Sequence, residues 1–90
     1  MSDWHIYIIQ TAKGQLYTGI TNNPERRLQQ HEEGKGAKFL RGKGPLTLVF
    51  QKKLGSHSEA ARVEPMIKSW PRHKKITLIE DPDSWTDLLT

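Results

Sequence analysis

The segment of residues 3–10, Asp-Trp-His-Ile-Tyr-Ile-Ile-Gln, constrains the fold more than any other part of the chain. Its β-branched and aromatic side chains are typical of a β-strand. Side chains alternate between the two faces of a strand, so this segment carries apolar groups on both faces. We therefore predict a strand that other elements cover on both sides. One face holds Trp4, Ile6 and Ile8, and the other holds His5, Tyr7 and Ile9.

The length of the chain limits how that strand can be covered. Its 90 residues allow one domain with a thin core, and the absence of cysteine excludes disulfides and cysteine-based zinc sites. No apolar run approaches the ~18 residues that a membrane span needs, and residues 1–4 do not resemble a signal peptide. We expect a soluble protein of a reducing compartment, the cytoplasm, with no membrane partner.

Two further strands complete the predicted sheet. Residues 16–20 follow a turn at Gly14, so the first two strands form an antiparallel hairpin. Residues 46–50 are apolar and β-prone and form the third strand. The predicted fold class is α+β, with a small central three-stranded antiparallel sheet flanked by helices. The register of the hairpin stays open, because several turn lengths fit the sequence.

The first predicted helix has clear signals at both ends. Asn23 is a good N-cap, Pro24 suits the first helical position, and Gly34 is a natural stop. Between these ends, Arg27 and His31 are four residues apart and lie on one face.

The second predicted helix begins with the capping-box spacing of Ser56 and Glu59. Pro65 removes a backbone hydrogen bond inside it and disfavours helical geometry at Glu64, so we expect a kink or an early end there. A single helical turn at residues 37–41, a short segment at residues 73–79 and a last turn at residues 85–89, capped by Ser84, complete the prediction.

Positive charge is concentrated in residues 1–79. They carry all 14 Lys and Arg residues but only six of the ten acidic residues, and residues 80–90 carry the other four acids. Between residues 35 and 43 there are four cations and no acid. Such a run either binds a phosphate backbone through counterion release or is a solvated loop. The candidate nucleic-acid-binding residues are Lys35, Lys38, Arg41 and Lys43.

Two tripeptides, His5-Ile6-Tyr7 and Tyr17-Thr18-Gly19, are followed by Arg27, His31 and Glu64. This order resembles the GIY-YIG nuclease superfamily, and most closely its small stand-alone bacterial members of the UPF0213 type. The resemblance covers about residues 3–80. It implies a nuclease-like domain over residues 1–80, followed by an acidic tail or a short terminal helix over residues 81–90.

The resemblance also implies a role for each matching position. Glu64 matches the glutamate that binds one divalent ion, Mg²⁺ or Mn²⁺, and Gly19 matches the glycine of the second motif. The chain departs from the family pattern at His5, which replaces the first-motif glycine, and at Ile20, where some members carry Lys. The catalytic residues implied are Tyr7, Tyr17, Arg27 and His31.

These residue types suit phosphodiester hydrolysis. A tyrosine can act as the base if nearby positive charge lowers its pKa. We favour Tyr7 as the base and Tyr17 as its partner, although the sequence does not decide between them. Arg27 is permanently cationic and can stabilise the charge that develops on a phosphate. His31 can orient a tyrosine or relay a proton. A single carboxylate such as Glu64, with waters and a phosphate oxygen, often holds Mg²⁺.

The predicted function is therefore a Mg²⁺-dependent DNA nuclease that is structure-directed or weakly specific, with DNA repair or recombination as the expected setting. Nucleic acid is the expected partner, DNA in preference to RNA, and the oligomeric state is open between monomer and homodimer. One alternative is a non-catalytic nucleic-acid-binding module on the same scaffold. Another is a protein-interaction domain that uses the acidic tail.

Overall fold

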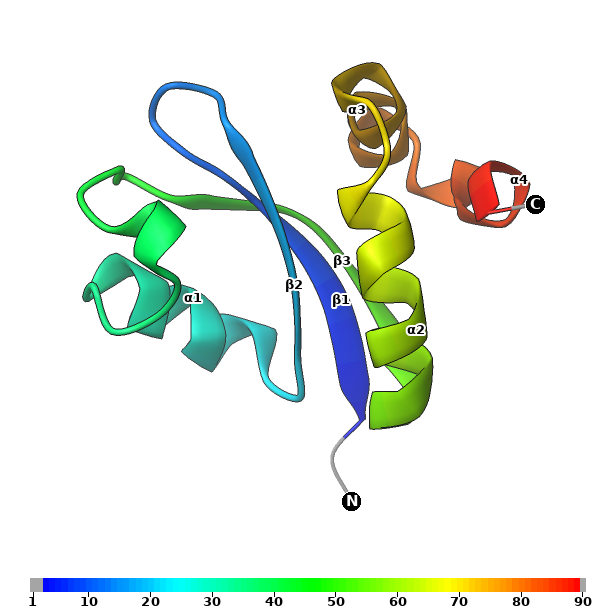
Figure 1. Cartoon of the computed structure of the whole chain (residues 1–90), viewed down its shortest axis with the longest axis horizontal. Coiled ribbons are helices and arrows are strands. Elements are labelled where there is room, and N and C mark those ends of the chain that lie inside the picture. Colours follow the sequence, from blue (N-terminus) through cyan, green and yellow to red (C-terminus); the bar gives the residue numbers. More distant parts are fainter. Residues whose placement is uncertain (1–2, 90) are drawn as a thin grey trace.

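A three-stranded antiparallel sheet forms the centre of the fold (Figure 1). The computed structural model describes residues 3–89, and in it β1 lies between β2 and β3. Helices flank this sheet, so the predicted fold class is confirmed. The strands are β1 (Trp4–Gln10), β2 (Leu16–Thr21) and β3 (Thr47–Gly55).

Strand β3 is longer than the predicted segment of residues 46–50. Its second half is polar, and Gln51, Lys52 and Lys53 are all exposed. The pairing with β1 nevertheless continues along this half, as far as the pair of Trp4 with Gly55. Backbone hydrogen bonds to the central strand hold this part of β3, together with the partly buried Leu54. The run of three polar residues before Leu54 hides the strand from a sequence-based prediction.

Helix α1 (Pro24–Glu32) begins and ends where the sequence predicts. The side chain of Asn23 accepts a hydrogen bond from the Arg26 N–H at 3.2 Å, which caps the first turn. Gly34 follows the helix with a φ of 78°, a conformation that favours glycine. Within the helix only His31 is buried, so it is the residue that α1 inserts into the protein.

Helix α2 (His57–Lys68) also starts as predicted, because the Ser56 Oγ accepts a hydrogen bond from the Glu59 N–H at 3.1 Å. The helix does not end early at Pro65 but continues to Lys68. Proline removes only its own N–H from the helix, while its carbonyl accepts the Ser69 N–H at 3.1 Å. The fully buried Ile67 anchors this last turn in the core.

The remaining elements are short. The 3₁₀ turn η1 (Lys38–Leu40) confirms the helical turn predicted at residues 37–41. Near the end of the chain, Trp85 stacks on Phe50 of β3 with ring centroids 5.8 Å apart. No helix within residues 3–89 is long and apolar enough to cross a membrane. The other elements are α3 (Arg72–Glu80), η2 (Pro82–Ser84) and α4 (Trp85–Leu89).

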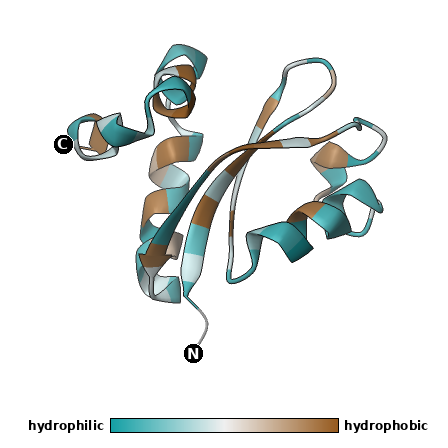
Figure 2. Cartoon of the chain, turned by 180° about the vertical axis from the view of Figure 1, so that it is seen from behind, coloured by the Kyte–Doolittle hydropathy of each residue, from teal (hydrophilic) through white to brown (hydrophobic). Residues whose placement is uncertain are grey.

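Both faces of β1 are covered, as its sequence predicts. On one face Ile6 and Ile8 pack in a cluster with buried residues of β3, α2 and α3. On the other face Tyr7 and Ile9 pack with Leu40 and its neighbours. Figure 2 shows hydrophobic colour along the sheet, whereas α1 is mostly hydrophilic. The partners in the first cluster are Phe50, Val63, Ile67 and Leu78.

The face that α2 turns to the sheet can be tested with two neighbouring residues. Ile67 is fully buried, whereas Met66 is 42% exposed. We expect Ile67→Ala to lower the free energy of unfolding by about 2–5 kcal/mol, because it removes core contacts and leaves a cavity. Met66→Ala should cost less than about 1 kcal/mol. Urea denaturation measures both, and equal losses would mean that α2 presents a different face.

Candidate active site

The register of the hairpin brings the two motif tyrosines to the same face of the sheet. Tyr7 pairs with Gly19, and Ile9 pairs with Tyr17. The tyrosines are therefore diagonal neighbours on adjacent strands. Their ring centroids are 6.4 Å apart. The two tripeptides that the sequence singles out thus form one cluster.

Gly19 makes room for the side chain of Tyr7. A Cβ at position 19 would overlap the Tyr7 hydroxyl, so no other residue fits there without a shift of the ring. The Tyr7 ring can therefore lie against the backbone of β2, and the side chain is only 2% exposed. The motif glycine is needed for this close approach.

His31 of α1 reaches the same cluster. Its Nε2 lies 2.9 Å from the Tyr7 hydroxyl in a buried hydrogen bond. Its ring also meets Tyr17 edge-on, with centroids 5.5 Å apart. The hydrogen bond joins β1 to α1 across 24 residues of sequence.

The loop after α1 fixes the proton on the His31 ring. The Ala37 N–H donates a hydrogen bond to His31 Nδ1 at 3.1 Å. Burial and the charge of Arg27 lower the pKa of His31 to about 4, so the ring is neutral at pH 7. A neutral imidazole has one donor and one acceptor nitrogen. Because Nδ1 accepts a hydrogen bond, Nε2 carries the ring proton, and this N–H donates a hydrogen bond to the Tyr7 hydroxyl oxygen.

Gly36 lets that loop pack directly on the imidazole. A Cβ at position 36 would overlap His31 Nδ1, as one at Gly19 would overlap the Tyr7 hydroxyl. The loop carries the sequence Gly34-Lys35-Gly36-Ala37. The sequence alone indicates only mobility for these glycines, whereas in the structure one of them touches the site.

Tyr7 is protonated at neutral pH. Burial raises the pKa of Tyr7 to about 12, although a hydrogen bond from Arg27 and its positive charge act in the opposite direction. The neighbouring Tyr17 and the carboxylate of Glu64 also raise it. These causes place Arg27 and Glu64 within electrostatic reach of the Tyr7 hydroxyl.

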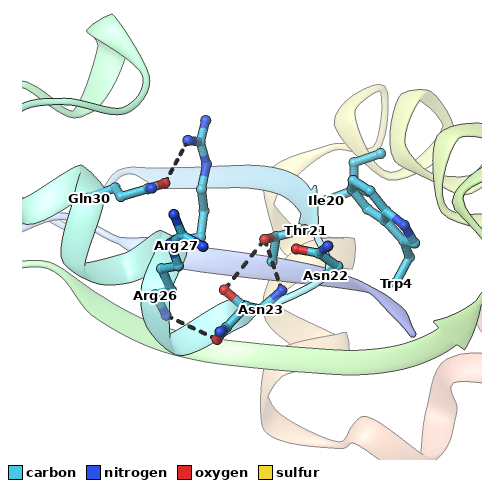
Figure 3. A pocket seen from close by; sticks show the side chains of 8 residues that line it. All are labelled: Trp4, Ile20, Thr21, Asn22, Asn23, Arg26, Arg27 and Gln30. Carbon is cyan, nitrogen blue, oxygen red and sulfur yellow. Dashed lines mark hydrogen bonds between the residues drawn. The ribbon is translucent and has the colours of Figure 1, made fainter. Parts of the chain in front are cut away.

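Arg27 lies between this cluster and an open cleft of about 240 Å³ (Figure 3). Its Nη1 donates a hydrogen bond to Gln30 Oε1 at 3.0 Å, which fixes the direction of the side chain. Arg26 lines the same cleft, and Trp4 and Ile20 lie opposite the arginines. A substrate phosphate could therefore reach Arg27 from solvent.

Glu64 comes from α2, which packs on the opposite face of the sheet and contacts β2 as well as β1. Its side chain is only 24% exposed, and its Oε2 lies 3.3 Å from Lys68 Nζ. The same Lys68 Nζ lies 5.9 Å from the centroid of the Tyr17 ring. The carboxylate is thus largely shielded from solvent, and its charge acts on the Tyr7 hydroxyl.

The residues around Glu64 fit a metal ion that is shared with the substrate. Within residues 3–89 no three His, Asp or Glu side chains cluster as a ready-made site. Mg²⁺ is often bound by one carboxylate together with waters and phosphate oxygens. Glu64 would supply that carboxylate, and an ion bound there would take the place of the Lys68 ammonium that pairs with it.

The predicted basic run divides into two parts. Lys35 lies 3.9 Å from Glu33, outside the site, and Lys38 belongs to η1. Arg41 and Lys43 line a second cleft. Four residues near the site received no role from the sequence, although two of them lie in the segment of residues 34–38 that resembles the family; they are Gln30, Gly36, Ala37 and Lys68.

Comparisons with known proteins agree with this geometry. The family model of the GIY-YIG catalytic domain matches residues 3–77. A UPF0213 protein of Aeromonas salmonicida (strain A449) is 49% identical over 84 residues, which cover 93% of this chain and 62% of that protein. This chain thus spans less than two thirds of the length of that relative. The UPF0213 protein YhbQ of Escherichia coli (strain K12 / DH10B) is 48% identical over 90 residues, the whole of this chain and 90% of YhbQ.

A solved structure shares the fold. The solution NMR structure of the UPF0213 protein BH0048 from Bacillus halodurans has 40% sequence identity to this chain and a TM-score of 0.56. The matched region covers 87% of this chain and 83% of the Bacillus halodurans chain. The family match, these relatives and the clustering of the motif residues lead to the same result. This chain belongs to the GIY-YIG family of nuclease domains.

Proposed function

We propose that this protein is a Mg²⁺-dependent nuclease that hydrolyses phosphodiester bonds in DNA, either structure-directed or with weak sequence specificity. The nuclease class follows from the family. DNA as the substrate and Mg²⁺ as the ion extend the family resemblance. Cutting that follows the structure of DNA would suit a role in DNA repair or recombination.

One observation carries the proposal: the hydroxyl of Tyr7 is surrounded by the other groups that the chemistry needs. His31 donates a hydrogen bond to it, and Arg27 and Glu64 both act on its pKa. These groups come from β1, α1 and α2. Their convergence next to an open cleft is hard to explain by packing alone, because buried polar groups are costly unless they are paired.

Arg27 is proposed to stabilise the pentavalent phosphate. Its guanidinium is permanently charged and can make two parallel hydrogen bonds to phosphate oxygens. Gln30 holds it in place at the wall of the cleft. Such donors commonly account for a factor of about 10²–10³ in rate.

Tyr17 is proposed as the base, with Tyr7 as a positioning residue. Tyr17 is partly exposed, whereas Tyr7 is buried and accepts a hydrogen bond from His31. Burial raises the pKa of Tyr7 to about 12, and a buried hydroxyl that is held by His31 is poorly placed to take a proton from water. Its hydroxyl hydrogen remains free to orient a neighbouring oxygen.

Glu64 is proposed to hold Mg²⁺ together with a phosphate oxygen of the substrate. When bound, the ion would supply Lewis-acid stabilisation of the leaving oxygen. Lys68 would then release the carboxylate and remain near the Tyr17 ring as a positive charge.

The second candidate function is binding of nucleic acid without cleavage. The observation in its favour is the ion pair of Glu64 with Lys68, which satisfies the carboxylate without a metal. The two functions differ in whether Mg²⁺ produces cleavage products.

The first test of the nuclease is cleavage of supercoiled and branched DNA with and without Mg²⁺. We expect cleavage only with the ion, and a loss of about 10²-fold or more in Glu64→Gln, because the Lewis acid loses its protein ligand. Glu59→Gln is the matched control, since this carboxylate lies on the same helix and is exposed. Equal rates for the two variants would point to a contaminating nuclease, and binding without any cleavage would favour the second candidate function.

The two tyrosines can be separated by their pH–rate profiles. If Tyr17 is the base, Tyr17→Phe should lower kcat by about 10²–10⁴-fold and abolish the rise of rate with pH. Tyr7→Phe should cost less and leave that rise in place, because Tyr7 only orients a neighbour. The reverse pattern would assign the base to Tyr7.

The neutral state of His31 predicts an acid-dependent stability. Its pKa is about 4 in the folded protein and about 6.5 when unfolded, so below pH 6.5 the unfolded state takes up the proton first. The contribution of neutral His31 to the free energy of unfolding is complete above pH 6.5. As the pH drops to 4, the free energy of unfolding falls by about 3 kcal/mol. Urea denaturation at several pH values should show that His31→Gln does not lose this stability in acid. The control variant His73→Gln, which changes an exposed histidine, should lose it as the parent protein does. Equal acid sensitivity of His31→Gln and the parent would show that His31 is not buried in its neutral form.

A further inference from the structure

A second cleft, of about 400 Å³, lies away from Arg27, between the tip of the β1–β2 hairpin and the loop of residues 41–44. It is larger than the cleft of about 240 Å³ beside Arg27. The two loops that form it come from distant parts of the sequence and lie side by side in Figure 1. Its lining residues are Ala12, Lys13, Gln15, Arg41, Gly42, Lys43 and Gly44.

The cleft has a fixed shape at its base. The Ala12 N–H donates a hydrogen bond to the Lys43 carbonyl at 3.1 Å, which ties the hairpin tip to the loop. The hairpin tip is itself closed by a hydrogen bond of 2.9 Å from the Thr11 N–H to the Gln15 carbonyl. The two loops that carry the cations of the cleft are therefore held together by backbone contacts.

The charges in the cleft are all of one sign. Lys13, Arg41 and Lys43 line it, and no acidic residue does. None of the ion pairs within residues 3–89 involves these three cations. Arg72 adds a further cation, since its Nη2 lies 3.9 Å from the position a Cβ would take at Gly14 in the hairpin tip. Like charges gathered in this way repel one another, and an anion between them would relieve the repulsion.

Two ring contacts connect this cleft to the candidate active site. The Nζ of Lys43 lies 3.6 Å from the centroid of the Phe39 ring. Phe39 in turn stacks on Tyr17 with centroids 6.1 Å apart. A single aromatic ring therefore separates the proposed base from the nearest cation of the cleft.

We propose that this cleft is a second phosphate-binding subsite, which holds a backbone phosphate of the nucleic acid next to the segment being cleaved. That the anion is a nucleic-acid phosphate rests on the proposed function. The position of the binding site rests on the cleft itself. Two of the cations in this subsite, Arg41 and Lys43, belong to the basic run predicted from the sequence. The third, Lys13, does not. The subsite would orient the strand so that the scissile phosphate reaches Arg27 and Tyr17.

The experiment compares two double variants that remove the same charge. Lys13→Ala/Arg41→Ala empties the cleft of two cations, whereas Lys53→Ala/Arg62→Ala removes two exposed cations that are paired with Asp3 and Glu59. Binding of a short DNA duplex is measured by fluorescence anisotropy in EDTA, where no cleavage takes place, over a range of salt concentrations. We expect the cleft variant to lose affinity by about tenfold or more and the slope of log K against log salt to fall by about 2. The control should change the slope by less than about 0.5.

The outcomes separate the subsite from the nuclease. Equal slope changes in the two double variants would overturn the subsite, whatever the cleavage assay shows. A selective loss in the cleft variant supports it, even if the parent protein binds DNA and never cleaves it. In cleavage assays with Mg²⁺, the cleft variant should raise KM and leave kcat within about twofold, and a loss confined to kcat would also contradict the proposal.

Discussion

The buried hydrogen bond between His31 and the Tyr7 hydroxyl is the contact on which the rest of the site depends. It ties the central strand to α1, and so it sets where the helix presents Arg27. Two glycines without side chains make this contact possible, Gly19 against the phenol and Gly36 against the imidazole. The amide of Ala37 completes the arrangement, because it selects the ring nitrogen that faces the tyrosine. The candidate site is thus assembled by close backbone packing as much as by its polar side chains.

Much of the fold could be predicted because its signals are local. The alternation of side chains in residues 3–10 and the caps at Asn23 and Ser56 each depend on neighbours in sequence. The second half of β3 could not be predicted, since backbone pairing rather than side-chain chemistry holds its polar residues in the sheet. At Pro65 a local rule failed, because burial of Ile67 outweighs the loss of one helical hydrogen bond.

The candidate site was predictable in its members but not in its geometry. The order of the motif residues resembles a known family, and that resemblance identifies Tyr7, Tyr17, Arg27, His31 and Glu64. Their relations depend on the register of the hairpin and on the path of two loops, which no local pattern determines. Lys68 illustrates the point: in the sequence it is one of many lysines, and only the fold places it between Glu64 and Tyr17.

The position of β2 at the border of the sheet limits how this architecture can be elaborated. A strand added beside β2 would take up its unpaired backbone groups. It would lie next to the strand that carries Tyr17 and Gly19 of the candidate site. A strand added beside β3 would have none of the motif residues on the strand next to it, so extension of the sheet at that border would disturb the candidate site less.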